Sequence, residues 1–244
     1  LAVPRGDEVI APINALAQML RMSLKDLARR GLRRLMSELA IRMLEAQAAV
    51  AERTMPKFGN RPRHLTIDLP RRIINPQSIF FGDNVWLGPG CFIAAVKEYP
   101  SASLRHPGKH YDVRTFSPQI HIGHRVTSSG NLVIGAVRRI DIGDDVMFAF
   151  NVTILDNLHG FEHPDEPYKY QPLQRIAPVQ IGRGCWIGQN VVILPAVIVG
   201  EMSIIGANSV VTHDIPERSI AVGAPARVVK QWDDGAREWR PCPA

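Results

Sequence analysis

A tandem six-residue repeat constrains this chain more than any other feature of its sequence. Between residues 181 and 215, isoleucine or valine returns at every sixth position, and a small or branched residue follows four positions after most of them. The positions that lead the hexads are Ile181, Ile187, Ile193, Val199, Ile205 and Val211. An α-helix cannot generate this spacing, because its side chains recur every 3.6 residues.

The same phasing appears in three earlier and shorter runs. Their leading positions are Phe81, Leu87 and Ile93, then Ile122, Ser128 and Ile134, then Ile142, Phe148 and Ile154. Each hexad predicts a short strand whose leading residue points into the core. A corner follows, where glycine, asparagine or aspartate takes backbone angles that other residues resist. One coil cannot bury its apolar face alone, so successive coils must stack. The repeat therefore predicts an all-β solenoid, a parallel β-helix.

The repeat is interrupted by two insertions, near residues 94–118 and 160–178. A smaller slip of two residues falls at Arg138 and Arg139. Functional residues concentrate on loops that leave a rigid scaffold, so the insertions are where we expect the site. The first insertion holds His106 and His110, which we interpret as surface residues.

The N-terminal part has a helical pattern from residue 11 to about residue 55, with leucines at three- and four-residue steps. We expect one or two helices there, with Gly31 as the place of the break if there are two. Seven of its residues between 21 and 42 are basic. This pattern fits a membrane-surface helix, although a solvated basic face on a helix whose leucine stripe packs against the rest of the protein is favoured.

Three regions follow from these patterns. We expect an N-terminal helical segment at 1–62, the β-helix with its insertions at 63–216, and a C-terminal tail at 217–244. The chain shows neither a 20-residue apolar stretch nor the pattern of a signal peptide.

The cysteines and the net charge indicate the cellular compartment and the class of partner. Cys91, Cys185 and Cys242 are odd in number and far apart, which argues against a disulfide framework or a zinc knuckle and favours the cytoplasm. Cys185 takes an inward hexad position and is expected in the core. The net charge of +6 favours polyanionic partners such as membrane surfaces or acidic glycans, and no nucleic acid partner is expected.

Three stretches carry a resemblance to a known family: residues 140–159 (IDIGDDVMFAFNVTILDNLH), residues 181–195 (IGRGCWIGQNVVILP), and residues 205–230 with the ending VGAPAR at 222–227. They resemble the hexapeptide-repeat acyltransferases, in particular the maltose and galactoside O-acetyltransferase group, over residues 73–230. The resemblance implies a left-handed parallel β-helix, an acyl group supplied by acetyl-CoA or another acyl-CoA, and direct attack on it in a ternary complex. It also implies a homotrimer with active sites between subunits.

His159 occupies the position of the catalytic histidine in this group, where the regular coil gives way to the second insertion. Moving an acyl group from a thioester to a hydroxyl requires a base that takes the hydroxyl proton, and an imidazole titrates in the right range. Asp156, Glu162 or His163 is expected to orient it.

The resemblance also assigns positions to the donor. Trp186, Gln189 and Ala207 match positions along the pantetheine arm of coenzyme A, and Thr212, Arg227 and Lys230 match positions near its phosphates. Basic side chains suit phosphate. Trp186 is equally consistent with a hydrophobic residue of the coil surface. His213 stands where a lysine is common in the family, which weakens the expected phosphate contact there.

The resemblance assigns the acceptor-binding residues less clearly. Ser129 and Val137 stand where the galactoside enzymes have asparagine and aspartate, so the family's galactoside is not the expected acceptor. Asn131 matches in kind. The second insertion adds Tyr168, Tyr170 and Arg175, which suit either contact with a sugar or packing between subunits. A saccharide or glycan precursor is the expected class of acceptor.

Two other functions stay open. A zinc hydratase of the γ-carbonic anhydrase type uses three histidines, which His124, His159 and His163 roughly mimic, but the close pair is four residues apart where that family has five. A non-enzymatic β-helix that acts as an assembly scaffold is the third candidate. The acyltransferase is preferred, and with it no metal site is expected.

Overall fold

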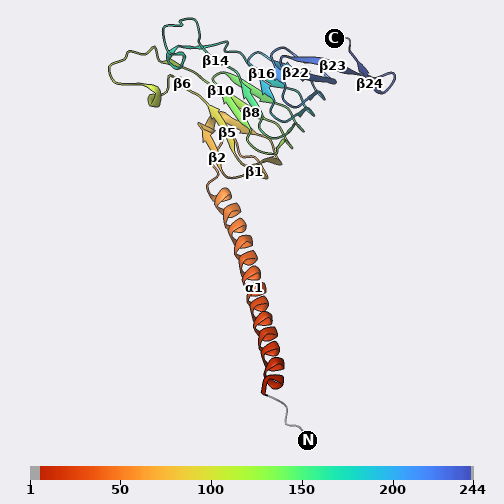
Figure 1. Cartoon of the computed structure of the whole chain (residues 1–244). Helices are drawn as coiled ribbons and strands as arrows, with labels where there is room; N and C mark the ends of the chain where they lie inside the picture. The colour runs from red at the N-terminus through yellow and green to blue at the C-terminus, as the bar shows by residue number, and fades with distance from the viewer. Residues whose placement is uncertain (1–5, 243–244) are drawn as a thin grey trace. The chain divides into compact units, whose positions relative to one another are not determined.

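The computed structural model describes the backbone of residues 6–242 and the side chains of residues 29–242. The chain divides at Arg53 into two compact units, a helical one and a larger β-structure. Helix α1 runs without interruption from Gly6 to Arg53 (Figure 1). Of the one or two helices expected, the structure has one, and Gly31 does not break it, because a single glycine costs only about 1 kcal/mol in a helix interior.

Helix α1 exposes much of its apolar surface in the described chain. Leu32, Leu35 and Leu39 are each about half exposed, so the structure does not confirm the expected burial of the leucine stripe. Among the residues described, no helix is apolar enough over sufficient length to cross a bilayer.

The second unit is a left-handed parallel β-helix whose coils contribute strands to three sheets in turn. In pairing order, sheet A contains β1 (Leu65–Ile67), β4 (Val85–Leu87), β9 (Thr127–Ser128), β12 (Met147–Phe148), β17 (Trp186–Ile187), β20 (Ile204–Ile205), β22 (Ser219–Gly223), β23 (Ala226–Asp233) and β24 (Glu238–Pro241). Sheet B contains β2 (Arg71–Ile74), β5 (Cys91–Ala95), β10 (Val133–Ala136), β13 (Thr153–Leu155), β18 (Val192–Ile193) and β21 (Val210–Val211). Sheet C contains β3 (Ile79–Phe81), β8 (Gln119–Ile122), β11 (Arg139–Ile142), β16 (Val179–Ile181) and β19 (Ile198–Val199).

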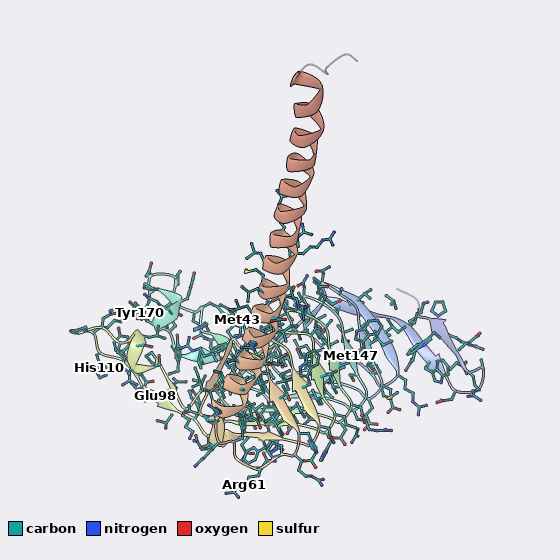
Figure 2. The ribbon with its side chains drawn as sticks, turned by 90° about the horizontal axis from the view of Figure 1, so that it is seen from below. Met43, Arg61, Glu98, His110, Met147 and Tyr170 are labelled. Atoms are coloured by element: carbon teal, nitrogen blue, oxygen red, sulfur yellow. The ribbon has the colours of Figure 1, made fainter. Side chains whose placement is uncertain are left out.

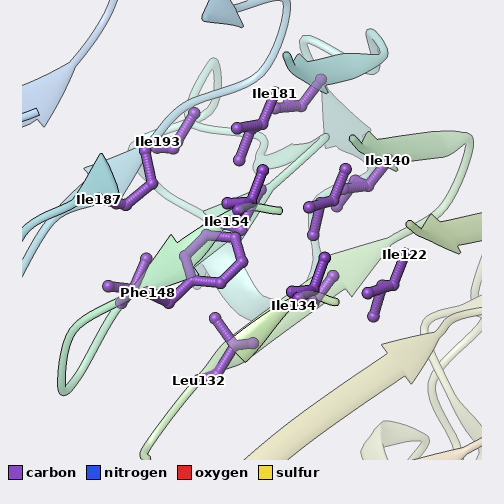
Figure 3. Packing of buried hydrophobic residues seen from close by; sticks show 14 of the residues in the cluster. Ile122, Leu132, Ile134, Ile140, Phe148, Ile154, Ile181, Ile187 and Ile193 are labelled. Atoms are coloured by element: carbon purple, nitrogen blue, oxygen red, sulfur yellow. The ribbon is translucent and has the colours of Figure 1, made fainter. Parts of the chain in front are cut away.

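The leaders of the hexads form the core, as predicted. Ile134, Ile154 and Ile193 stack in register along sheet B, and Ile122, Ile142 and Ile181 do so along sheet C. All six are at most 4% exposed, and Figure 3 shows such side chains filling the space between the sheets. Three hexads therefore complete one coil, one for each sheet.

The corners use left-handed backbone angles, as the repeat predicted. Asn151, Asn190 and Asn208 have φ values of 63°, 58° and 61°. Their side chains also form a ladder between coils, since the Asn151 amide donates to Asn190 and the Asn190 amide donates to Asn208, each at 2.9 Å. Asparagine suits the position because it tolerates this conformation.

Parallel pairing continues past the expected end of the β-helix at residue 216. Strand β22 pairs with β20 in parallel, and β23 and β24 then add antiparallel strands to sheet A. At the other end, β1 already pairs with β4 in parallel.

Both insertions leave the solenoid at the corner between sheets B and C, one after β5 and the other after β13. The first contains β6 (Glu98–Tyr99), the short 3-10 helix η2 (Ala102–Leu104) and β7 (Arg114–Thr115). The second contains β14 (Leu158–His159), η3 (Tyr168–Tyr170) and β15 (Leu173–Gln174). A further 3-10 turn, η1 (Pro76–Ser78), precedes β3. Figure 1 shows β6 and β14 projecting from the same side of the coils.

Candidate active site

His159 lies at the end of β14, where the chain leaves the coil. Strand β14 pairs antiparallel with β15, so that His159 lies opposite Leu173 at the two ends of the second insertion. The imidazole is exposed. A base at the rim of a rigid scaffold can be reached by a substrate, which is the placement that the sequence predicted for it.

Tyr99, from the first insertion, is the hydrogen-bond partner of His159. Its hydroxyl oxygen lies 3.0 Å from Nδ1 of His159, and the two rings meet edge to face with their centroids 5.3 Å apart. The same hydroxyl donates to the backbone carbonyl of Lys169 in η3. Tyr99 is 7% exposed, and its burial raises the pKa of the phenol.

The sequence did not single out Tyr99. It lies 60 positions from His159, in an insertion that follows no repeat. The available signal was a large aromatic residue within an insertion, and the structure shows that Tyr99 packs in a small cluster with Val137 and Leu173.

Further contacts join the two insertions. The Lys109 ammonium lies 2.7 Å from a carboxylate oxygen of Glu166 and 3.9 Å from the centroid of the Tyr170 ring. His106 and Tyr111, also from the first insertion, contact the same ring. Figure 2 shows Glu98, His110 and Tyr170 together on one side of the solenoid. The insertions thus form one joined surface next to His159.

Asp156 has a different environment from the one expected of an orienting group. Its buried carboxylate accepts hydrogen bonds from the backbone N–H groups of Val137, Arg138 and Arg139 at 2.9, 2.7 and 2.7 Å, and from the amide of Asn157 at 2.9 Å. It therefore stabilises the two-residue slip in the repeat.

The other two orienting candidates lie in the second insertion. The backbone of His163 is held by the side chain of buried Gln171, which accepts from its N–H at 3.1 Å and donates to its carbonyl at 2.7 Å. Glu162 is exposed. The described contacts assign the place beside His159 to Tyr99 instead.

The expected donor residues fall in three places. Trp186 is 47% exposed on the outer face of sheet A, in register with Met147 and Ile204. Gln189 and Ala207 are exposed at the corner between sheets A and B.

The donor residues assigned to phosphate lie at another corner and in the tail. Thr212 follows β21 at the B–C corner, and its hydroxyl lies 2.7 Å from Nδ1 of His213. Arg227 and Lys230 are exposed on β23. These two cations are accessible to an anionic ligand.

The expected acceptor residues are likewise divided. Ser129 and Asn131 follow β9 at the A–B corner, where a Cβ added to Gly90 would meet the Asn131 side chain at 1.9 Å. Tyr168, Tyr170 and Arg175 lie in the second insertion with His159. The two groups thus lie at opposite edges of sheet B, and one chain does not bring them together.

Among the described residues, the cysteine and histidine side chains do not cluster into a metal site. No three His, Cys, Asp or Glu side chains between residues 29 and 242 are grouped as ligands. His124 lies at the C–A corner, where its Nδ1 accepts from the Asp83 N–H at 2.9 Å. Cys185 is buried and its thiol donates to the Gly200 carbonyl at 3.1 Å, as its core assignment predicted.

Comparison with known families agrees with this architecture. The family model "bacterial transferase hexapeptide (six repeats)" matches residues 178–213. A coil of hexads with an exposed histidine where an insertion begins therefore defines the class, a hexapeptide-repeat transferase.

Relatives of known name narrow the class further. The chain is 32% identical over 180 residues to the putative lipopolysaccharide biosynthesis O-acetyl transferase WbbJ of Escherichia coli. The aligned region covers 71% of this chain and 82% of that protein. It is 38% identical over 124 residues to the galactoside O-acetyltransferase of Escherichia coli, covering 49% of this chain and only 58% of that protein. The chain belongs to the hexapeptide-repeat acetyltransferase family, which confirms the resemblance.

A solved structure supports the fold. The N-acyltransferase AntD from Bacillus cereus, in complex with dTDP-4-amino-4,6-dideoxyglucose and coenzyme A, superimposes with a TM-score of 0.57 at 21% identity, covering 73% of this chain and 87% of that one. This likeness confirms the predicted left-handed β-helix.

Proposed function

We propose that this protein is an acyl-CoA-dependent O-acyltransferase, in the first place an acetyltransferase, that acylates a hydroxyl of a saccharide or glycan precursor. The observation that carries the proposal is the exposed imidazole of His159, anchored through Nδ1 by Tyr99 where two insertions meet. Family membership supplies the reaction class, because the chain covers most of a putative O-acetyl transferase.

In this proposal His159 is the general base. Its imidazole takes the proton of the acceptor hydroxyl while that oxygen attacks the thioester carbonyl carbon. Backbone N–H groups at the coil edge stabilise the tetrahedral oxyanion. The carbon–sulfur bond then breaks, and the coenzyme A sulfur receives the proton from His159. No acyl-enzyme forms, which agrees with the burial of Cys91 and Cys185.

Coenzyme A is proposed to lie along the C-terminal coils. Thr212 shares the B–C corner with His159, and Arg227 and Lys230 offer accessible cations for its phosphates. Trp186 provides an exposed aromatic face for the pantetheine arm. The acceptor is proposed to contact Tyr168, Tyr170 and Arg175.

The division of the site supports the proposal of a homotrimer with active sites between subunits. Ser129, Asn131 and Gln189 lie across sheet B from His159, so a second copy must supply them if they contribute to the same site. The outer face of sheet A offers a surface for that contact, since Trp86, Met147 and Trp186 are each nearly half exposed. The protein is proposed to work in the cytoplasm, with helix α1 available for peripheral membrane contact.

Thiol release from acetyl-CoA, screened against a panel of free, nucleotide-linked and lipid-linked glycans, tests the proposal. His159→Ala is expected to lower kcat by at least about 10³-fold, while calorimetry shows unchanged coenzyme A binding. His121→Asn serves as the matched control, because His121 stacks on Phe80 on sheet C rather than beside His159, and its loss is expected to leave turnover unchanged. Turnover that survives His159→Ala would refute the mechanism, and a lack of turnover with every acceptor would favour the scaffold hypothesis.

A further inference from the structure

The hydrogen bonds of the Tyr99 hydroxyl have a fixed direction. The Lys169 carbonyl can only accept, so the hydroxyl proton of Tyr99 points toward it. The Tyr99 oxygen then faces Nδ1 of His159 with a lone pair, at 3.0 Å. A hydrogen bond forms there only if Nδ1 carries the proton of the neutral imidazole.

We infer that Tyr99 is a positioning residue that holds His159 in the Nδ1–H tautomer, so that Nε2 is the atom that takes the acceptor proton. This inference rests on the proposed function of His159. Tyr99 itself exchanges no proton in the reaction. Its role is to fix which nitrogen is basic and where the imidazole points.

The surroundings of Tyr99 suit a fixed support. Its ring is held by Val137 from the coil and by Leu173, the residue opposite His159 on β15. Strand β6 is anchored by antiparallel pairing with β7, which places Tyr99 opposite Arg114. Burial raises the pKa of the phenol, so the hydroxyl stays protonated and keeps its donor bond to Lys169.

The same hydroxyl also ties the base to the proposed acceptor surface. Lys169 lies between Tyr168 and Tyr170 in η3, and its carbonyl is the acceptor of the Tyr99 hydroxyl. Lys109 of the first insertion adds its contacts to Glu166 and Tyr170. The first insertion, which follows no repeat, thereby obtains a function: it supplies the group that orients the base and holds the second insertion beside it.

During the proposed reaction this arrangement keeps its hydrogen bonds. Nε2 gains a proton when the acceptor oxygen attacks, and the imidazolium keeps its Nδ1–H bond to Tyr99. The proton leaves from Nε2 to the coenzyme A sulfur when the carbon–sulfur bond breaks. The tautomer present at the start is restored, ready for the next cycle.

The test compares Tyr99→Phe with Tyr111→Phe in the full chain. Tyr99→Phe removes the hydroxyl and keeps the ring. Tyr111→Phe removes a hydroxyl of the same insertion, whose one hydrogen bond among the described residues is accepted from the His106 N–H at 3.0 Å. Tyr99→Phe is expected to lower kcat about 10- to 100-fold, with KM for acetyl-CoA within about twofold of the wild type. Tyr111→Phe keeps the wild-type kcat.

Long-range ¹H–¹⁵N spectra of the histidine side chains give a readout independent of turnover. The His159 signals are assigned by their absence in His159→Asn. We expect Nδ1–H in the wild type and in Tyr111→Phe, and a shift toward Nε2–H in Tyr99→Phe. A wild-type Nε2–H tautomer, or an unchanged tautomer and kcat in Tyr99→Phe, overturns the inference.

Failure of the two proposals can be told apart. If His159→Asn is inactive but Tyr99→Phe retains full turnover, His159 is still supported as the general base, and the positioning role of Tyr99 is refuted. If His159→Asn is active, the proposed function of His159 is refuted, whichever tautomer the spectra show.

Discussion

The backbone N–H of Arg138 donates a 2.7 Å hydrogen bond to the carboxylate of Asp156, which lies in the following coil. The N–H groups of Val137 and Arg139 converge on the same buried carboxylate. These three consecutive residues form the corner where the six-residue period slips. Asp156 thus replaces the backbone acceptors that an uninterrupted coil would have provided.

Loss of this carboxylate is expected to destabilise the solenoid. Asp156→Ala leaves three N–H groups without their acceptor, of which that of Val137 is buried, and we expect the free energy of unfolding to fall by about 2–4 kcal/mol. Urea denaturation followed by circular dichroism measures it. Asp112→Ala, which removes an exposed carboxylate paired with Arg114, is the control and should change stability little. Equal effects of both substitutions would contradict the capping role of Asp156.

Buried Cys185 makes stability depend on alkaline pH. Burial raises the pKa of its thiol to about 11, above the ordinary thiol value of about 9 expected in the unfolded chain. Because the folded pKa is the raised one, this contribution is fully present below pH ~9 and is lost as the pH rises toward 11. The loss amounts to about 2–3 kcal/mol.

Cys185→Val isolates this contribution, since valine takes the equivalent hexad position at Val191 and Val197. Denaturation at pH 8 and at pH 11 should show a smaller decline for Cys185→Val than for the wild type. Cys242→Ser, at a partly exposed position near the C-terminus, should decline as the wild type does. Identical declines in all three proteins would show that Cys185 does not titrate in this range.

The solenoid could be predicted from the sequence because its burial is periodic. Ile134 and Ile154 occupy the inward positions that their phase predicts, and Asn190 and Asn208 take the left-handed angles expected at corners. Helix α1 lies where one or two helices were predicted, and Gly31 does not interrupt it. One glycine cannot outweigh the helical residues on both sides of it.

The contacts at the candidate site could not be predicted, because they join residues that no local pattern relates. Tyr99 and His159 meet only because both insertions leave the same corner, and the sequence does not say at which corner an insertion leaves. Asp156 was one of three residues expected to orient His159, because a general base usually has a hydrogen-bonding partner on its other nitrogen. Its carboxylate turns toward Arg138 instead, where the slip left backbone N–H groups without partners.

Trp186 offers a test of the donor side. If its exposed ring lines the pantetheine arm, Trp186→Ala should raise KM for acetyl-CoA about 10-fold while kcat changes less than about threefold. Trp86→Ala is the matched control, because Trp86 lies on the same face of sheet A and is 45% exposed against 47% for Trp186. Steady-state kinetics with acetyl-CoA as the varied substrate measures both. An equal response of the two variants would favour a general role of this face in packing.

Helix α1 is the remaining element, and its charge leads to the last prediction. Arg30, Arg33 and Arg34 are exposed along it, and such residues each contribute about 1 kcal/mol near an anionic bilayer. The protein is therefore expected to sediment with vesicles containing phosphatidylserine and not with vesicles of phosphatidylcholine alone. Replacing these three arginines with glutamine should weaken this binding about 100-fold or more, and added salt should weaken the wild type.

Truncation of residues 1–53 separates this role from stability. The remaining chain contains every strand of the β-helix and forms a compact unit of its own, so its melting temperature should stay within about 2 °C of the full chain. The truncated protein should nevertheless lose its binding to anionic vesicles. If it still binds them, the membrane contact lies on the β-helix and not on α1, because the basic residues of the helix are then absent.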